Sequence, residues 1–166
     1  MKIKDIIKSL AFAPSGIHSY FVKINDKIGI KITQSAEEHY NIAEWQTFLS
    51  SNGLAPELIH QFEFDYHYSH YYCSIMEVVE VLDLACESDF ESSDYARIAD
   101  EEDEKYQHLV DELDNDLISI GVSWRDRHCG NIGFKNGKIV LIDMGELYDI
   151  ANDIEEDFYE MDSRLD

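Results

Sequence analysis

The chain has 166 residues, enough for one domain or two small lobes, and 45% of them are apolar, which excludes wholesale disorder. Its formal net charge of -22 argues against nucleic acid and anionic membranes as partners, because both repel a strongly acidic surface. A basic protein partner is compatible with this charge.

Two further patterns concern the cellular setting. No apolar run is long enough to span a bilayer, and Asp5 and Lys8 interrupt the apolar N-terminal stretch, which disfavours a signal peptide. The three cysteines, Cys73, Cys86 and Cys129, are widely spaced and form no CxxC pair. This usage predicts reduced thiols and a cytoplasmic protein.

Residues 18–32, HSYFVKINDKIGIKI, are the first predicted elements in chain order: two strands around a turn at Asn25-Asp26. In the second strand, isoleucines alternate with Gly29 and Lys31. One face of this strand is therefore expected to be apolar, and the other to carry lysines and a glycine.

A helix is predicted over residues 35–53, because Ser35 followed by Glu38 forms a capping-box pattern and Gly53 ends the apolar stripe. Two more strands follow, at residues 57–64 and 71–82. The first half of the chain is thus predicted as an antiparallel sheet with one inserted helix.

The second half is predicted to be more helical. Residues 81–104 are interpreted as an acidic hinge or linker, and the polar, heavily acidic residues 87–104 within it are predicted to form a solvated linker or a loosely held helix. Helical spacing of leucines predicts an amphipathic helix over residues 105–122, and the tail at 146–166 is predicted as another acidic helix. We therefore expect an N-lobe over residues 1–80 and a C-lobe over residues 105–166.

A hairpin near the C-terminus gathers the residues with the clearest chemistry. A two-residue turn at Asn136-Gly137 brings Asn131 and Asp143 to the same open end, and Asp126 lies five residues before Asn131. Magnesium takes oxygen ligands, usually one or two side chains together with phosphate oxygens and water. Asn131 and Asp143 are therefore the predicted metal ligands, and Asp126 is the residue expected to orient a nucleophile.

The stretch WRDRHCGNIGFKNGKIVLIDMG, residues 124–145, resembles the protein-kinase-like superfamily. Its RD, four residues and then Asn131 fit the catalytic loop pattern H-R-D-x-x-x-x-N, and IDMG resembles D-F-G. It is especially similar to bacterial and phage kinase-like phosphotransferases. The resemblance implies that Asp126 is the catalytic base and that Asn131 and Asp143 carry Mg²⁺.

The resemblance continues in the first half of the chain. It implies that Lys31 reaches the phosphates of ATP and that Gly29 leaves room for the adenine. It also implies that a glutamate on the helix pairs with Lys31. Glu44 is the expected partner, and Glu37, on a similar face, is the alternative.

Two other segments fit less regularly. Gly16 lies where the family has a glycine-rich phosphate loop, with Pro14 and Ser19 in place of two other glycines. Glu77 to Val79 resemble the hinge whose main-chain groups bind the adenine edge. The resemblance covers roughly residues 13–145, and its five positions occur in the family's order.

The implied protein is a Mg-ATP-dependent phosphotransferase with a two-lobed, α+β kinase-like fold and a reduced C-lobe. Its acceptor would be a hydroxyl of a protein, for example serine, of a small molecule, or of the chain itself. A second hypothesis is an acidic binding protein of the same fold that inhibits a basic partner with little or no turnover.

Two weaker interpretations concern metal and thiol chemistry. His67, His70 and Cys73 have spacing suited to zinc, but no fourth ligand is evident. Cys129 lies near the predicted site without a neighbouring base, so an inert thiol is expected there.

Overall fold

The computed structural model of the chain describes residues 19–84 and 92–151. The chain divides into two compact units, residues 1–80 and 81–166, and each is described by itself. Both units combine helices with antiparallel strand pairs, so the fold belongs to the predicted α+β class. No helix within the described ranges combines the length and the apolar character needed to cross a membrane.

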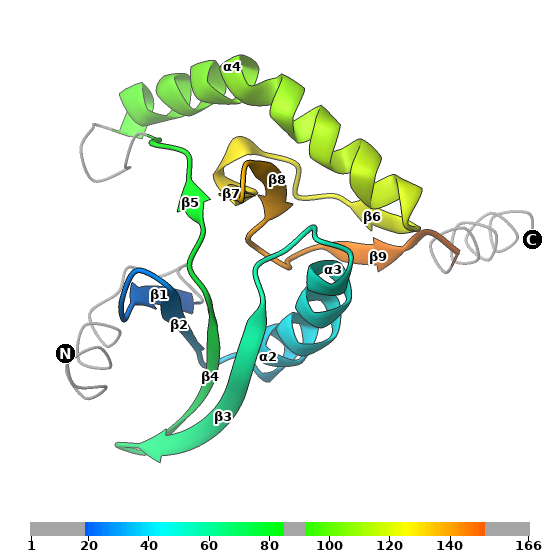
Figure 1. Cartoon of the computed structure of the whole chain (residues 1–166). Coiled ribbons are helices and arrows are strands. Elements are labelled where there is room, and N and C mark those ends of the chain that lie inside the picture. The colour runs from blue at the N-terminus through cyan, green and yellow to red at the C-terminus, as the bar shows by residue number, and fades with distance from the viewer. Residues whose placement is uncertain (1–18, 85–91, 152–166) are drawn as a thin grey trace, which may run out of the picture. The chain divides into compact units, whose positions relative to one another are not determined.

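Unit 1 is built on a four-stranded antiparallel sheet with the order β1-β2-β4-β3 (Figure 1). The predicted turn between the first two strands is present, because Asn25 Oδ1 accepts hydrogen bonds from the main-chain N–H groups of Lys27, at 2.8 Å, and Ile28, at 3.0 Å. The strands are β1 Ser19–Lys23, β2 Ile28–Thr33, β3 Leu58–Tyr66 and β4 Ser69–Glu77.

The two faces of this sheet differ, as the alternation in β2 predicts. One face holds an apolar cluster in which Ile32 and Cys73 are completely buried. On the opposite face, the register places Lys31 between Phe21 of β1 and Ser74 of β4. This second face, with its buried polar groups, is the one that the helix of unit 1 meets.

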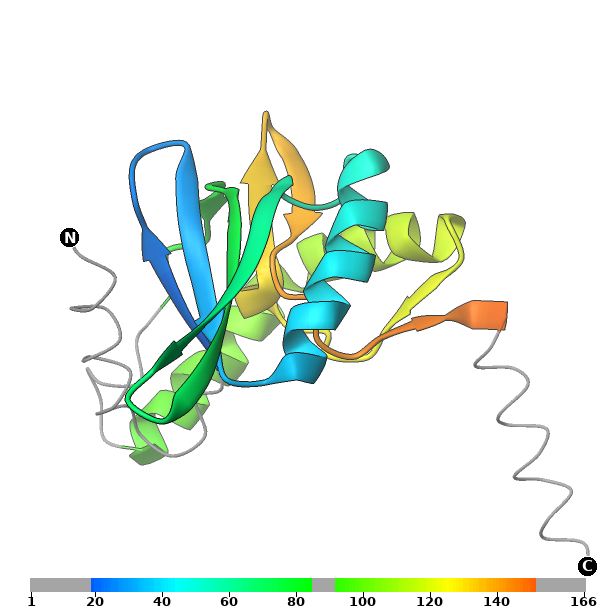
Figure 2. The ribbon, with the colours of Figure 1, turned by 90° about the horizontal axis from the view of Figure 1, so that it is seen from below.

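The helix of unit 1 begins after Ser35 and is followed by Gly53, as predicted. It comprises α2 Ala36–Asn41, the π-helical η1 Ile42–Gln46 and α3 Thr47–Ser51, which Figure 2 shows as one continuous rod beside the sheet. Ser35 Oγ accepts a hydrogen bond from the Glu38 N–H at 3.2 Å, but the Ser35 N–H donates to Thr33 Oγ1 at 3.0 Å. Only half of the capping box forms, which leaves the Glu38 carboxylate for another partner.

In the described part of unit 2 one long helix, α4, spans Ser92–Ser119, so the stretch predicted as a linker or a loosely held helix is helical from Ser92 onward, and the linker interpretation is wrong there. Its first half contains two alanines and three glutamates, which favour helix, and Arg97 pairs with Glu101 one turn later. Its second half buries the predicted leucine stripe, including Leu113 and Leu117. The exposed, charged first half of α4 is thus helical as an extension of the second half, whose leucines are buried.

The remaining strands form a two-stranded and a three-stranded sheet, ordered β6-β9 and β5-β7-β8. Asn136 and Gly137 have φ values of 53° and 78°, as a tight two-residue hairpin turn requires. Part of the predicted C-terminal helix is instead strand β9, and residues beyond 151 lie outside the described ranges. The strands are β5 Glu80–Val81, β6 Val122–Trp124, β7 Ile132–Lys135, β8 Lys138–Leu141 and β9 Leu147–Asp149.

Candidate functional site

Lys31, the predicted phosphate ligand, is a buried cation in unit 1. Its Nζ lies 2.9 Å from Oε1 of Glu38, and the two side chains are only 10% and 22% exposed. A buried charge costs free energy unless it is paired and hydrogen-bonded. The Glu38 carboxylate therefore supports a charged lysine at this position of the sheet.

Glu38 replaces the predicted partners of Lys31, which is a correction. Glu44 and Glu37 are both exposed, whereas Glu38 is half-buried. Glu37 and Glu44 are seven residues apart, about two turns, and so occupy the same side of the helix. Glu38 lies about 100° around from Glu37, on the side that also buries Ile42 at i+4. The prediction chose the correct helix and the wrong side of it.

The Glu38 carboxyl is ionised although it is partly buried. Burial raises its pKa, but the charge of Lys31 and hydrogen bonds from Thr33, Lys31 and Ser19 lower it by more. The net effect places the pKa of Glu38 below its ordinary value. At neutral pH Glu38 is therefore a carboxylate.

The room expected for adenine beside Gly29 is filled by an aromatic ring. A Cβ atom at position 29 would lie 2.2 Å from Cζ of Phe21, so a larger residue there would require this ring to move. Phe21 is nevertheless 50% exposed. An adenine ring could therefore contact the Phe21 ring or displace it, but the two rings cannot both occupy the space beside Gly29. Gly16, the predicted phosphate-loop glycine, lies outside the described residues.

The predicted hinge begins where β4 ends, at Glu77. The Glu77 N–H donates to the Glu57 carbonyl oxygen at 2.9 Å, and Glu77 Oε2 accepts from the Glu57 N–H at 3.1 Å. The N–H of Val78 is also bonded, to a carbonyl oxygen 2.9 Å away. Val79 follows as a half-buried residue. The first two N–H groups of this segment are thus already engaged within unit 1.

In unit 2, three carboxylates of α4 hold the loop that follows β6. Asp103 Oδ1 accepts a hydrogen bond from the Cys129 main-chain N–H at 3.0 Å. Nη2 of Arg127 lies 3.1 Å from Asp114 Oδ2 and 3.3 Å from Asp111 Oδ1. The long helix therefore acts as the support on which this loop is fixed.

Asp126 and Asn131, two of the predicted site residues, are in direct contact. The Asn131 side-chain nitrogen Nδ2 donates to Asp126 Oδ2 at 2.8 Å and to the Asp126 carbonyl oxygen at 3.1 Å. An amide nitrogen has two N–H groups, so both are used on Asp126. Within the described ranges no hydrogen bond involves Oδ1 of either side chain. One oxygen of each residue is thus left for a ligand.

Asp143 lies next to this pair along the hairpin. The N–H of Ile142 donates to the Asn131 carbonyl oxygen at 2.9 Å, which ties the residue before Asp143 to the start of β7. Asp143 Oδ1 accepts from the Gly145 N–H at 3.2 Å and so fixes the turn that follows. The hairpin therefore brings the ends that carry Asn131 and Asp143 together, as its turn predicts.

These residues fit a magnesium ion better than a metal held by protein alone. No group of three or more histidine, cysteine or acidic residues suited to a metal ion is found in the described ranges. Magnesium needs fewer side chains when phosphate oxygens and water complete its shell. An amide oxygen of Asn131 and a carboxylate of Asp143 provide one neutral and one anionic ligand of the required hard type.

The zinc interpretation of His67, His70 and Cys73 has no support in the geometry. The ring of His70 lies between two carboxylates, with Nδ1 2.8 Å from Asp65 and Nε2 3.1 Å from Glu63. Hydrogen bonds to Asp65 and Glu63 raise the pKa of His70, so its protonated form, which lacks a free nitrogen lone pair, is favoured.

Cys129 is a free, buried thiol, in agreement with the inert role predicted for it. Burial raises its pKa to about 12, and a hydrogen bond and the charge of Asp103 add to this effect. Because the thiolate is the nucleophile, such a thiol has almost none of the reactive form at neutral pH.

Two residues of the site were missed from the sequence. Glu38 was named only as a cap, although its spacing from the buried side of the helix could have identified it. His128 was not named at all, yet its Nε2 lies 2.9 Å from Asn131 Nδ2 and 3.4 Å from Asp126 Oδ2. Only its place inside the loop motif could have drawn attention to it.

Neither a family model nor a curated protein matches this chain. The functional assignment therefore depends on the geometry of the residues described above.

Proposed function

We propose that the chain is a Mg-ATP-dependent, kinase-like phosphotransferase with the two-lobed fold implied by its motifs. The observation that carries the proposal is the contact between Asp126 and Asn131. Each residue anchors the other through one group and keeps one oxygen for a ligand. The buried Lys31–Glu38 pair supports the proposal independently, because phosphoryl transfer depends on fixed charges that position the phosphates.

In this proposal, unit 1 supplies phosphate binding. Lys31 donates to phosphate oxygens of ATP, and Glu38 acts on Lys31 as a positioning residue. A lysine on a flexible side chain loses conformational freedom when it binds, and a partner that already holds it reduces that loss. Phe21 lies against Gly29, the position at which the resemblance implies room for the adenine.

Unit 2 supplies the chemistry at the transferred group. Asn131 and Asp143 hold Mg²⁺, which when bound offsets negative charge on the phosphate oxygens. The acceptor hydroxyl oxygen forms a bond to the γ-phosphorus, and the bond from that phosphorus to the bridging oxygen of ADP breaks. Asp126 accepts the hydroxyl proton on Oδ1, the oxygen that Asn131 does not use.

A radiolabelled transfer assay, preceded by calorimetry with Mg-ATP, tests this function. Asp126→Asn should lower transfer by roughly 10²–10⁴-fold, the usual effect of losing a general base, and largely spare nucleotide binding. Asp143→Asn should weaken Mg-ATP binding as well as transfer. No heat of binding at millimolar Mg-ATP, in protein shown to be folded, would refute the proposal.

A matched pair of glutamates tests the corrected partner of Lys31. Glu38→Gln removes the charge that holds Lys31 and should raise the Kd for Mg-ATP, whereas Glu44→Gln changes an exposed residue on the same helix and should not. Equal effects of the two substitutions would show that the ion pair has no part in binding nucleotide.

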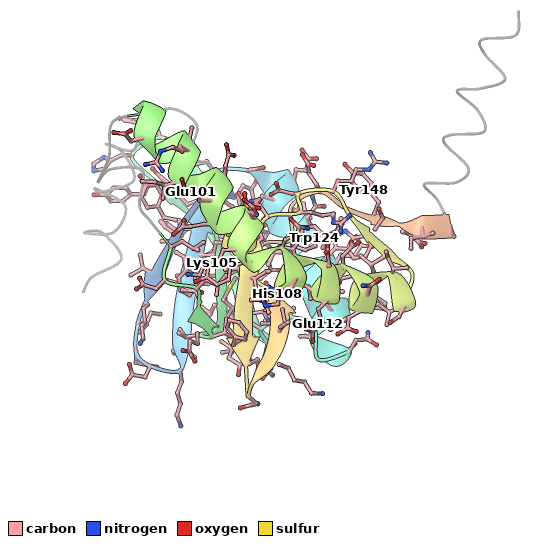
Figure 3. All side chains as sticks on the ribbon, turned by 90° about the horizontal axis from the view of Figure 1, so that it is seen from above. Glu101, Lys105, His108, Glu112, Trp124 and Tyr148 are labelled. Carbon is pink, nitrogen blue, oxygen red and sulfur yellow. The ribbon has the colours of Figure 1, made fainter. Side chains whose placement is uncertain are left out.

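The exposed side of α4 favours a second candidate, an acidic protein that binds a basic partner. Figure 3 labels four residues along this helix, Glu101, Lys105, His108 and Glu112, all exposed. A thermal shift assay separates the two functions. Mg-ATP at a hundred times its Kd should stabilise an enzyme by about 2.7 kcal/mol, and a binder without a nucleotide site not at all. The exposed acidic residues of α4 are Asp94, Asp100, Glu101, Glu104, Asp111, Glu112 and Asp116.

A further inference from the structure

We infer that His128 is a positioning residue for the transfer reaction, an inference that rests on the proposed function. The imidazole of His128 is held at a fixed place between Gly130, Asn131 and Asp126. It contacts both the base and one metal ligand of the proposed site without being either of them. Its role is to hold the Asp126 carboxylate in one orientation.

The loop leaves space for the His128 ring beside Gly130. A Cβ atom at position 130 would lie 2.9 Å from both Cε1 and Nδ1 of His128, so the ring occupies the space that any side chain other than glycine would need. The Gly130 N–H donates to Nδ1 at 3.1 Å and caps the short helical turn Cys129–Asn131. The hydrogen bond from Gly130 and the missing side chain at position 130 thus favour this position of the imidazole.

The hydrogen bond from Gly130 determines which tautomer of His128 is present. Because Nδ1 accepts a hydrogen bond from Gly130, a neutral imidazole must carry its proton on Nε2. Nε2 then cannot accept from Asn131, although Nδ2 lies 2.9 Å away. The two N–H groups of that amide are accounted for by the two oxygens of Asp126 described above.

The carboxylate of Asp126 is the second group that the His128 ring approaches. Its Oδ2 accepts from Asn131 Nδ2 and lies 3.4 Å from Nε2 of His128, a long contact of the kind that tightens when a site binds its ligands. Two donors thus converge on Oδ2, and Oδ1 is left for the acceptor hydroxyl. His128 thereby determines which carboxylate oxygen faces the reaction.

Three variants test this role. His128→Ala removes the ring, and His128→Asn keeps a small side chain with an N–H donor. Gly130→Ala keeps the imidazole but displaces it, because the added methyl group would overlap the ring. His108→Ala is the matched control, since it removes an exposed histidine of α4.

The first measurement needs no activity. Imidazole ¹⁵N shifts of the nucleotide-free parent should report the tautomer with hydrogen on Nε2. The side-chain amide signal of Asn131 should move in His128→Ala and in Gly130→Ala but not in His108→Ala. A proton on Nδ1, or an unmoved Asn131 signal in both variants, would overturn the inference whatever the enzyme does.

The second measurement is steady-state transfer. His128→Ala and Gly130→Ala should lower kcat by about 10–100-fold, the usual effect of losing a residue that orients a ligand or base, and leave the KM for Mg-ATP within about twofold. Partial recovery in His128→Asn supports positioning. An active parent whose kcat survives His128→Ala refutes only this inference. A parent that neither binds Mg-ATP nor transfers phosphate refutes the proposed function and this inference with it.

Discussion

Replacing Arg127 with glutamine would measure how firmly α4 holds the loop after β6. Nη2 of Arg127 lies 3.1 Å from Oδ2 of Asp114, whose side chain is only 12% exposed. Loss of the cation leaves this carboxylate nearly buried without its charge partner, which costs about 3–5 kcal/mol in a fully buried pair. Arg127 is itself 43% exposed, so solvent screens the pair, and exposed pairs contribute only about 0.2–1 kcal/mol. We expect an intermediate loss of about 1–2 kcal/mol in the free energy of unfolding.

Urea unfolding followed by tryptophan fluorescence measures this loss. The chain has two tryptophans, and a Trp45→Phe background leaves Trp124, which is 2% exposed in unit 2, as the only reporter. With a slope of about 1–3 kcal/mol per molar urea, the midpoint for Arg127→Gln should fall by roughly 0.3–2 M. A fluorescence midpoint equal to that of the parent would refute the reasoning.

Two aspartates of α4 that contact Arg127 complete the experiment: Asp111 provides a control variant, and Asp114 provides a double-mutant cycle. Asp111→Asn changes a side chain that is 53% exposed, 3.3 Å from the same guanidinium, and should shift stability by less than about 0.5 kcal/mol. Combining Arg127→Gln with Asp114→Asn removes both partners of the tighter contact. The double variant should then lose less than the sum of the two single losses, because neither charge is left uncompensated.

Two more predictions concern unit 1. Gly29→Ala should lower the free energy of unfolding by about 1–3 kcal/mol, because the methyl group overlaps the Phe21 ring, and Phe21→Ala in the same chain should recover part of that loss in urea unfolding. Hydrogen bonds to Asp65 and Glu63 raise the pKa of His70, so its contribution to stability is fully present below the unfolded value near 6.5 and is lost as pH rises through the folded pKa. His70→Gln should therefore unfold with a smaller stability loss between acidic and alkaline pH than the parent, and identical pH profiles would contradict this assignment.

The elements that sequence reasoning placed correctly have local causes. The turn at Asn136-Gly137 needs two residues with positive φ, and asparagine followed by glycine is the pair that adopts them most readily. The Ser35 cap is equally local, because its hydroxyl reaches an N–H only three residues away. In both cases the signal and the structure lie within a few residues of each other.

The sequence could not decide between a linker and a helix for residues 87–104 for the opposite reason. The stretch from Ser92 to Glu104 has few apolar residues, and composition alone suggested a solvated segment. Its helix instead extends the part of α4 whose leucines are buried farther along the chain, so the cause is not local. Once a helix is nucleated and packed, each added residue needs only modest intrinsic propensity.

The site shows the same division between local and distant causes. The spacing of Asp126, Asn131 and Asp143 is set inside one loop and hairpin, and the sequence was sufficient to group them. The partner of Lys31 depends on which side of a helix meets the sheet, and seven-residue spacing made Glu37 and Glu44 look equivalent while both face solvent. His128 could be identified only from the structure. Its position depends on the missing side chain of Gly130, and its proposed role depends on the Asp126 carboxylate that it approaches. A glycine two residues after a histidine is a weak pattern, and it becomes informative only when the backbone shows what fills the space.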